Sequence, residues 1–172
     1  MSVLQNLIAL LILKATPQDL PYSTQLTLKL VAGYVISGIV VLQATLNPDG
    51  LIQELLLGLL IQLVFTYAVL RALNYGARFV QTFCAILGVG ILFNLISWPI
   101  LAMLSDAAAS DTMKSSLSLM FLMIMSWEVL VKAHIYKHAL EIKMFSALAL
   151  SFSLFFISIA LLQLLFPAEM SK

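Results

Sequence analysis

The chain is poor in charge and in cysteine. Only 10% of its 172 residues are charged and 62% are hydrophobic, whereas an average soluble domain is about 25% charged and about 45–50% apolar. A soluble fold of this length could not cover so much apolar surface, so the composition predicts that lipid is the solvent. The single cysteine, Cys84, excludes an internal disulfide.

The sequence also lacks the short motifs of common enzymes. There is no G-x-S-x-G, no P-loop, no G-x-G-x-x-G, no H-E-x-x-H and no C-x-x-C. Nine basic and eight acidic residues leave a net charge of +1, without the dense basic patch that nucleic-acid binding needs. These absences predict a protein that is not an enzyme, holds no cofactor or metal and binds no nucleic acid.

Five long apolar segments predict an all-α, polytopic membrane protein that forms a single membrane domain over residues 1–172. A transmembrane helix needs about 20 predominantly apolar residues. The expected spans cover residues 24–46, 51–73, 79–104, 115–133 and 144–166. Residues 47–50, Asn-Pro-Asp-Gly, form a tight-turn signature, so the first two spans should form an antiparallel hairpin.

The N-terminal apolar stretch, residues 3–14, is too short to span a bilayer. No positive charge precedes it and no small-residue cleavage site follows it, which argues against a signal peptide. We expect a short helix that lies in the membrane interface or packs on the helix bundle.

Basic residues fall unevenly along the chain. Those expected on one side of the membrane are Lys14, Lys29, Arg71, Arg78, Lys132, Lys137 and Lys143, and those expected on the other are Lys114 and Lys172. The positive-inside rule then predicts a cytoplasmic N-terminus and an extracytoplasmic C-terminus.

Glu128 is the acidic residue that the expected spans submerge. Charges at a bilayer centre cost about 2.5–3.5 kcal/mol on insertion scales, so intramembrane acids are candidate functional groups. Lys132 follows four residues later, the favoured spacing for a Glu–Lys helix pair. We expect a Glu128–Lys132 ion pair near the inner end of the fourth span. A proton- or ion-coupling role and a partner-binding role are the alternatives.

A basic face is expected at the inner ends of the helices. Its members are Arg71, Arg78, Lys132, Lys137 and Lys143. Such a face would bind a partner or anionic lipid headgroups, at about 1 kcal/mol per basic residue. His134, His138 and Glu141 would share one helical face if the fourth helix continued that far. Their spacing permits a metal site, but a solvated or headgroup-contacting face fits these basic surroundings better.

Small and kink-forming residues mark the expected helix contacts. Gly33, Gly38, Gly88 and Gly90 allow neighbouring helices to approach closely, and Pro99 should kink the third span. Three polar residues within the spans should hydrogen-bond between helices: Gln62, Gln81 and Asn94.

Two local patterns lie within this arrangement. One is Arg78-Phe79-x-Gln81-Thr82-x-x-Ala85-x-x-Gly88, which leads to Pro99. The other is Trp127, followed by His134 and by His138-Ala139-Leu140. With the five-span order, they resemble the Yip family (Ypt-interacting membrane proteins), in a bacterial-type member, over about residues 24–166. The resemblance implies a compact five-helix membrane domain without known catalysis. Eukaryotic members are linked to Rab-type GTPases and vesicle membranes. This chain lacks their long soluble N-terminal region, which argues against GTPase binding.

Three functions follow as hypotheses. The first is a scaffold, assembly or accessory subunit of a larger membrane complex, whose partners are other membrane-protein subunits or further copies of this chain. The alternative is a small transporter or ion-conducting subunit that uses Glu128. The third is a membrane-shaping protein that binds anionic lipid through its basic inner face.

Overall fold

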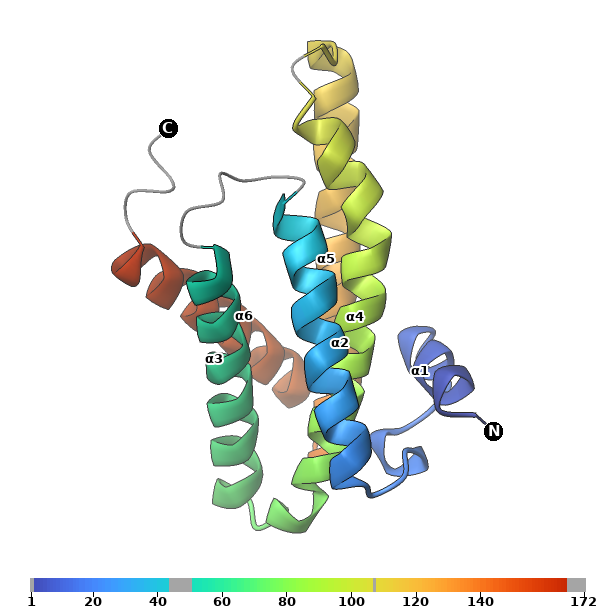
Figure 1. The fold of residues 1–172 in the computed structure, drawn as a ribbon. Helices are drawn as coiled ribbons and strands as arrows, with labels where there is room; N and C mark the ends of the chain where they lie inside the picture. The colour runs from blue at the N-terminus through green and yellow to red at the C-terminus, as the bar shows by residue number, and fades with distance from the viewer. Residues whose placement is uncertain (1, 44–50, 107, 167–172) are drawn as a thin grey trace.

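The computed structural model describes residues 2–43, 51–106 and 108–166, and all regular structure in these ranges is helical. Five long helices dominate it (Figure 1): α2 (Thr24–Gln43), α3 (Leu51–Ala72), α4 (Phe79–Leu104), α5 (Asp111–Leu140) and α6 (Met144–Leu165). Each is long and apolar enough to cross a membrane. The chain is therefore an all-α, multi-pass membrane protein.

Helix α5 is longer at both ends than the expected fourth span, residues 115–133. It begins at Asp111, where the Ser110 hydroxyl accepts a hydrogen bond from the Met113 amide at 3.3 Å. It continues through its basic last turns to Leu140 and ends where Glu141 adopts a left-handed conformation, with φ of 57°. The additional turns move every residue of α5 further from the helix end than the sequence suggested.

The other expectations concern short stretches of the chain. Pro99 lies inside α4, which continues to Leu104. The expected turn at residues 47–50, the end of the first expected span and the final residues from Pro167 onward lie outside the described residues.

Helix α4 lies at the centre of the bundle. Residues 82–90 are all buried. Helix α2 runs parallel to α4 and contacts it in register: the Thr27 hydroxyl lies 3.1 Å from the Cys84 sulfur, and the Asn94 amide donates to the Ser37 hydroxyl at 3.0 Å. The first two spans do run in opposite directions (Figure 1), but α2 packs most extensively on α4.

Glycines allow α2 to approach its neighbours closely. A Cβ atom at Gly38 would overlap the side chain of Leu55 on α3, and one at Gly90 of α4 would lie 2.7 Å from Cε2 of Tyr34. A Cβ atom at Gly33 would lie 3.1 Å from an isoleucine side chain of α4. These contacts lie where the sequence placed small residues, because only a missing side chain lets two helix backbones come this near.

The N-terminal helix α1 (Val3–Leu11) packs on the bundle. Leu7 and Leu10 are buried, and Leu7 occupies the space next to Gly88 of α4, where a Cβ atom would overlap it. Of the two placements that the sequence left open, the structure has the packed one. The opposite face of α1 remains apolar and exposed, through Leu4, Ile8 and Ile12.

Residues 3–20 form a hairpin that runs along α4 and α5 on the outside of the bundle and returns. The Trp127 indole N–H donates to the Leu11 carbonyl at 3.0 Å. Seven residues further along α5, His134 Nε2 lies 3.0 Å from the Ala15 carbonyl. Trp127 precedes the last residue of α5 by thirteen residues, which is about 20 Å at about 1.5 Å per residue. The hairpin therefore lies alongside α5 to about 20 Å from the end of that helix, and it is named here the re-entrant hairpin.

Polar side chains satisfy the limb of the re-entrant hairpin that is not α-helical, which includes the 3-10 helix η1 (Pro17–Asp19). Gln81 Nε2 donates to the carbonyls of Gln18 at 3.3 Å and Leu20 at 2.8 Å, and Asn6 Nδ2 donates to the Asp19 carbonyl at 2.8 Å. Non-helical backbone at membrane depth is tolerated only where the protein itself supplies such partners. Gln81 thus contacts this limb of the chain, whereas a bond between spans was expected.

Replacing Trp127 with phenylalanine should loosen the re-entrant hairpin. The Leu11 carbonyl would lose this donor, which should lower the free energy of unfolding by about 0.5–1.5 kcal/mol, the usual net contribution of one hydrogen bond. Backbone amide hydrogen exchange of residues 3–20, measured in detergent, should be faster in this variant than in the parent protein. Trp98→Phe, which leaves the Leu11 contact intact, is the control; equal exchange in the two variants would contradict the prediction.

Candidate functional site

Two partly buried charges of α5 form an ion pair. Lys132 Nζ lies 2.6 Å from Glu128 Oε1, and the two side chains are 16% and 18% exposed. Both residues lie on one face of the helix because four residues advance an α-helix by slightly more than one turn.

The pair lies further from the end of its helix than the expected span placed it. Glu128 was expected in the inner half of its span, close to the rim. Because α5 continues to Leu140, Glu128 lies twelve residues from the helix end, which is about 18 Å at about 1.5 Å per residue. Tyr34 and Gln62, which lie near it, occupy the midpoints of α2 and α3. The pair thus lies near the middle of the bundle.

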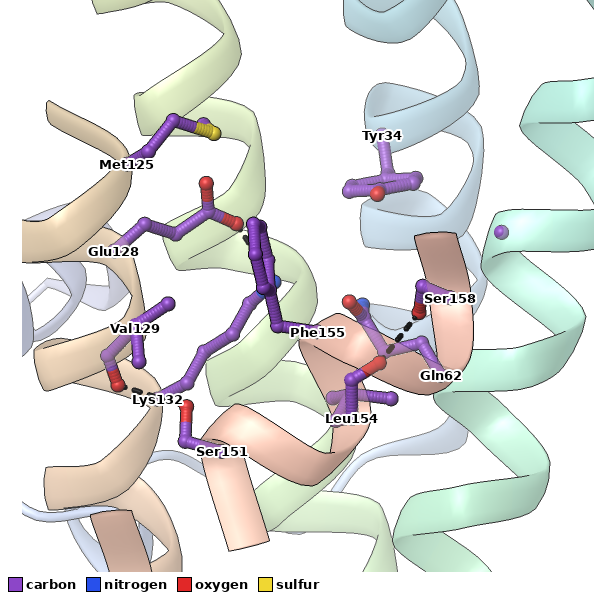
Figure 2. Close-up of a pocket in the computed structure, with 11 residues that line it drawn as sticks. Tyr34, Gln62, Met125, Glu128, Val129, Lys132, Ser151, Leu154, Phe155 and Ser158 are labelled. Atoms are coloured by element: carbon purple, nitrogen blue, oxygen red, sulfur yellow. Dashed lines mark hydrogen bonds and ion pairs between the residues drawn. The ribbon is translucent and has the colours of Figure 1, made fainter. Parts of the chain in front are cut away.

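A cavity of about 210 Å³ opens beside the ion pair, between α2, α3, α5 and α6. Figure 2 shows side chains from these helices around it, with Met125, Leu154 and Phe155 contributing apolar walls. The polar side chains that line it, named here the cavity set, are Tyr34, Gln62, Glu128, Lys132, Ser151 and Ser158.

One member of the cavity set has an unused donor. Ser151 donates to the Val129 carbonyl and Ser158 to the Leu154 carbonyl, each at 2.8 Å (Figure 2). Gln62 is only 5% exposed, yet its Nε2 has no hydrogen-bond partner among the described residues. A buried donor without a partner costs about 1–3 kcal/mol, so an empty cavity would leave this amide unfavourably placed.

The five residues of the expected basic face lie toward one end of the bundle but differ in exposure. Arg71 and Lys143 are exposed, and Lys137 and Arg78 are half-buried. Lys132 points into the cavity (Figure 2), where it pairs with Glu128. The surface that could meet a partner or lipid at this end is therefore smaller than the sequence suggested.

Arg78 ties the start of α4 to the end of α5. Its Nη2 lies 2.6 Å from Glu141 Oε1 and its Nη1 donates to the Ala139 carbonyl at 3.1 Å. The Tyr75 hydroxyl also donates to Glu141, at 3.2 Å. The Arg78 guanidinium, and then the Tyr75 hydroxyl, hold the pKa of the Glu141 carboxyl below its usual value. Because α5 ends before Glu141, this residue does not continue the helical face of the two histidines.

Acid should weaken the Arg78–Glu141 tie. The carboxyl has a usual pKa of 4.5 and a lower one in the folded protein, so its contribution to stability is present above 4.5 and is lost as the pH falls through the lower value. Thermal unfolding in detergent should show a steeper loss of stability below pH 4.5 for the parent protein than for Glu141→Gln. Identical pH profiles would rule out the tie as a source of stability.

The two histidines of α5 serve the re-entrant hairpin. His134 contacts the Ala15 carbonyl, and the His138 carbonyl accepts a hydrogen bond from the Gln18 side chain at 2.8 Å. Their rings lie 4.5 Å apart, centre to centre. Residues 2–43, 51–106 and 108–166 contain no group of three potential metal ligands.

Sequence reasoning missed half of the cavity set. It singled out Glu128 and Lys132, and it expected Gln62 to bond between helices. Ser151, Ser158 and Tyr34 carried no signal, since single polar residues in apolar helices are common. A shared depth on four helices is a tertiary property that spacing along the chain does not reveal.

Fold and site together define a multi-pass α-helical membrane protein with a polar cavity near the middle of its bundle. No family model matches the chain, and no similar curated protein or solved structure was found. The resemblance to the Yip family stays a prediction.

Proposed function

We propose that this chain is a non-enzymatic accessory or assembly subunit of a larger membrane complex in a bacterial-type inner membrane. The observation that supports this role is the exposed face of α6. Only 11% of the most apolar window of α6 is buried within the chain, against 56% for α4. The exposed face carries small residues beside the exposed ring of Phe156: Ser146, Ala149, Ser153 and Ala160.

Small residues on a lipid-facing helix favour close packing of another helix. Membrane helices associate through van der Waals contact and short polar side chains, because lipid supplies no hydrophobic driving force between them. The buried side of α6, with Ala147, Ser151 and Leu154, already packs within the chain. The small-residue side is therefore free, within the described chain, to receive a helix of a partner subunit or of another copy.

Co-purification tests this role. The protein, isolated from its native membrane in mild detergent, should carry a stoichiometric partner or a second copy, and Ala149→Leu with Ser153→Leu should release it. Ala68→Leu, at an exposed position of α3, is the control and should keep it. Recovery of the parent protein only as an isolated monomer would contradict the proposal.

The proposed orientation places the N-terminus in the cytoplasm and the C-terminus outside. Its support is the exposure of Lys14, Lys29, Arg71 and Lys143 toward one end of the bundle, as the positive-inside rule requires. Anionic lipid headgroups would bind at the same end. A membrane-impermeant thiol reagent applied from outside should label Ala108→Cys in intact cells but not Lys143→Cys; the reverse result would invert the topology.

A transport role is the second candidate, and the cavity beside Glu128 favours it, since transporters bind substrates near the bilayer midplane. The 2.6 Å contact with Lys132 weighs against ion conduction, because it neutralises the acid. Flux through reconstituted protein tests the role. Flux that Glu128→Gln leaves unchanged, or no flux in the parent protein, would remove this candidate.

A further inference from the structure

The buried amide of Gln62 indicates what the cavity lacks. Its Nε2 has no partner among the described residues, and the serine hydroxyls beside it already donate to backbone carbonyls. An amide donor in a membrane-spanning bundle requires an acceptor, because lipid offers none. A carboxylate, phosphate or carbonyl oxygen inside the cavity would satisfy it.

The ion pair determines which net charge the cavity accepts. Lys132 and Glu128 together are neutral, and both line the cavity. An ammonium group has three donors and a carboxylate two acceptor oxygens, so one contact between them leaves both able to bind a guest. A guest with net charge would leave that charge unpaired in a low-dielectric site, which is costly. A molecule that carries one charge of each sign adds none.

The size of the cavity limits the guest. Its volume of about 210 Å³ is below the range of about 300–1,000 Å³ that is typical of pockets for drug-sized ligands. Gly58 lines it from α3, and a Cβ atom there would meet nothing within 4 Å. This glycine therefore leaves open space in the cavity instead of allowing a helix contact.

We propose that this cavity is a binding site for a small zwitterionic group. The anionic end, a carboxylate or phosphate, binds Lys132 and the Gln62 amide. The cationic nitrogen binds Glu128, with the Tyr34 ring nearby. Such a group occurs in free amino acids and betaines and in the headgroup of phosphatidylethanolamine. The site does not depend on the accessory role proposed above.

Binding to purified full-length protein tests the proposal. Glycine, glycine betaine and phosphoethanolamine are titrated in dodecyl maltoside by calorimetry, beside the singly charged acetate and methylammonium. At least one zwitterion should bind with Kd below about 1 mM, and the singly charged compounds at least about 10-fold more weakly, since each leaves a charge unpaired.

A lipid arm separates the two sources of the group. The protein is reconstituted into nanodiscs that contain equal amounts of phosphatidylethanolamine and phosphatidylglycerol. It is then released from the nanodiscs inside the instrument, and native mass spectrometry identifies the lipids that stay bound. Retention of one phosphatidylethanolamine per chain, without binding of the free compounds, identifies the headgroup as the guest. If neither free zwitterions nor phosphatidylethanolamine bind, the cavity holds water only and the proposal is wrong. Equal binding of the singly charged compounds would also overturn it, because the site would then not select a zwitterion.

Two variants locate the site without disturbing packing. Gly58→Val fills open space, and Gln62→Met removes the unpartnered donor while keeping a long side chain. Each should weaken zwitterion binding by at least about 10-fold, in line with the loss of a hydrogen bond to a charged group, and leave the Tm unchanged or higher. Gln53→Met, at an exposed position of α3, should bind as the parent does. Unchanged binding by Gly58→Val would place any bound zwitterion elsewhere and overturn the assignment.

Discussion

Replacing Lys132 with methionine should lower the free energy of unfolding by about 3–5 kcal/mol, the usual cost of removing one partner from a buried ion pair. The variant would leave the Glu128 carboxylate without its 2.6 Å partner, inside a helix bundle where both side chains are less than one-fifth exposed. Because the carboxylate is only 18% exposed, solvation would replace little of the lost attraction.

A double-mutant cycle separates this pairing from a simple loss of packing. Glu128→Gln with Lys132→Met removes both charges and should recover most of the stability that Lys132→Met loses, because no unpaired charge remains. Chemical unfolding in mixed micelles measures all four proteins. If the double variant is as unstable as the sum of the single variants, the ion pair does not stabilise the bundle.

The second large effect is expected at Gly88. A valine there would occupy the space of Leu7 and force α1 away from α4. Leu7 and Leu10 would lose their burial, and since a fully buried leucine contributes about 1.5–3 kcal/mol, we expect a loss of about 3 kcal/mol. Limited proteolysis should then cut within residues 2–20, which the parent protein protects.

Two controls accompany the Gly88 variant. Gly58→Val makes the same substitution where no atom lies within 4 Å, so it should leave the re-entrant hairpin protected. Adding Leu7→Ala to Gly88→Val should restore part of the stability by making room for the new side chain. Protection of residues 2–20 in the single Gly88→Val variant would show that α1 does not depend on this contact.

The helices that the sequence predicted best are those whose signal is local. A long apolar run must become a helix in lipid, because every backbone group needs a partner within its own segment, and α4 accordingly runs over residues 79–104 as expected. The span expected for α5 ended at residue 133, with a helical continuation beyond it left open, because polar residues after Lys132 suggested solvent. They remain helical because α5 packs there on α4 and on the re-entrant hairpin.

The contacts of the site also differ in whether the sequence could predict them. The Glu128–Lys132 contact follows from a spacing of four residues within one helix, so the sequence alone was sufficient to predict it. Gln81, Trp127 and His134 instead support the re-entrant hairpin. Their role requires the N-terminal segment to be buried, and its composition fitted a surface helix equally well.

By itself, the sequence determined that this chain is a bundle of five apolar helices with one submerged acid and a basic residue one turn away. Hydrophobic length and helical periodicity are enough for that, since both act within a single segment. Only the tertiary structure decided that α1 packs against Gly88 and that Tyr34, Gln62 and Glu128 face one cavity. Those placements depend on how helices distant in sequence approach and tilt against one another, and no local pattern encodes that geometry.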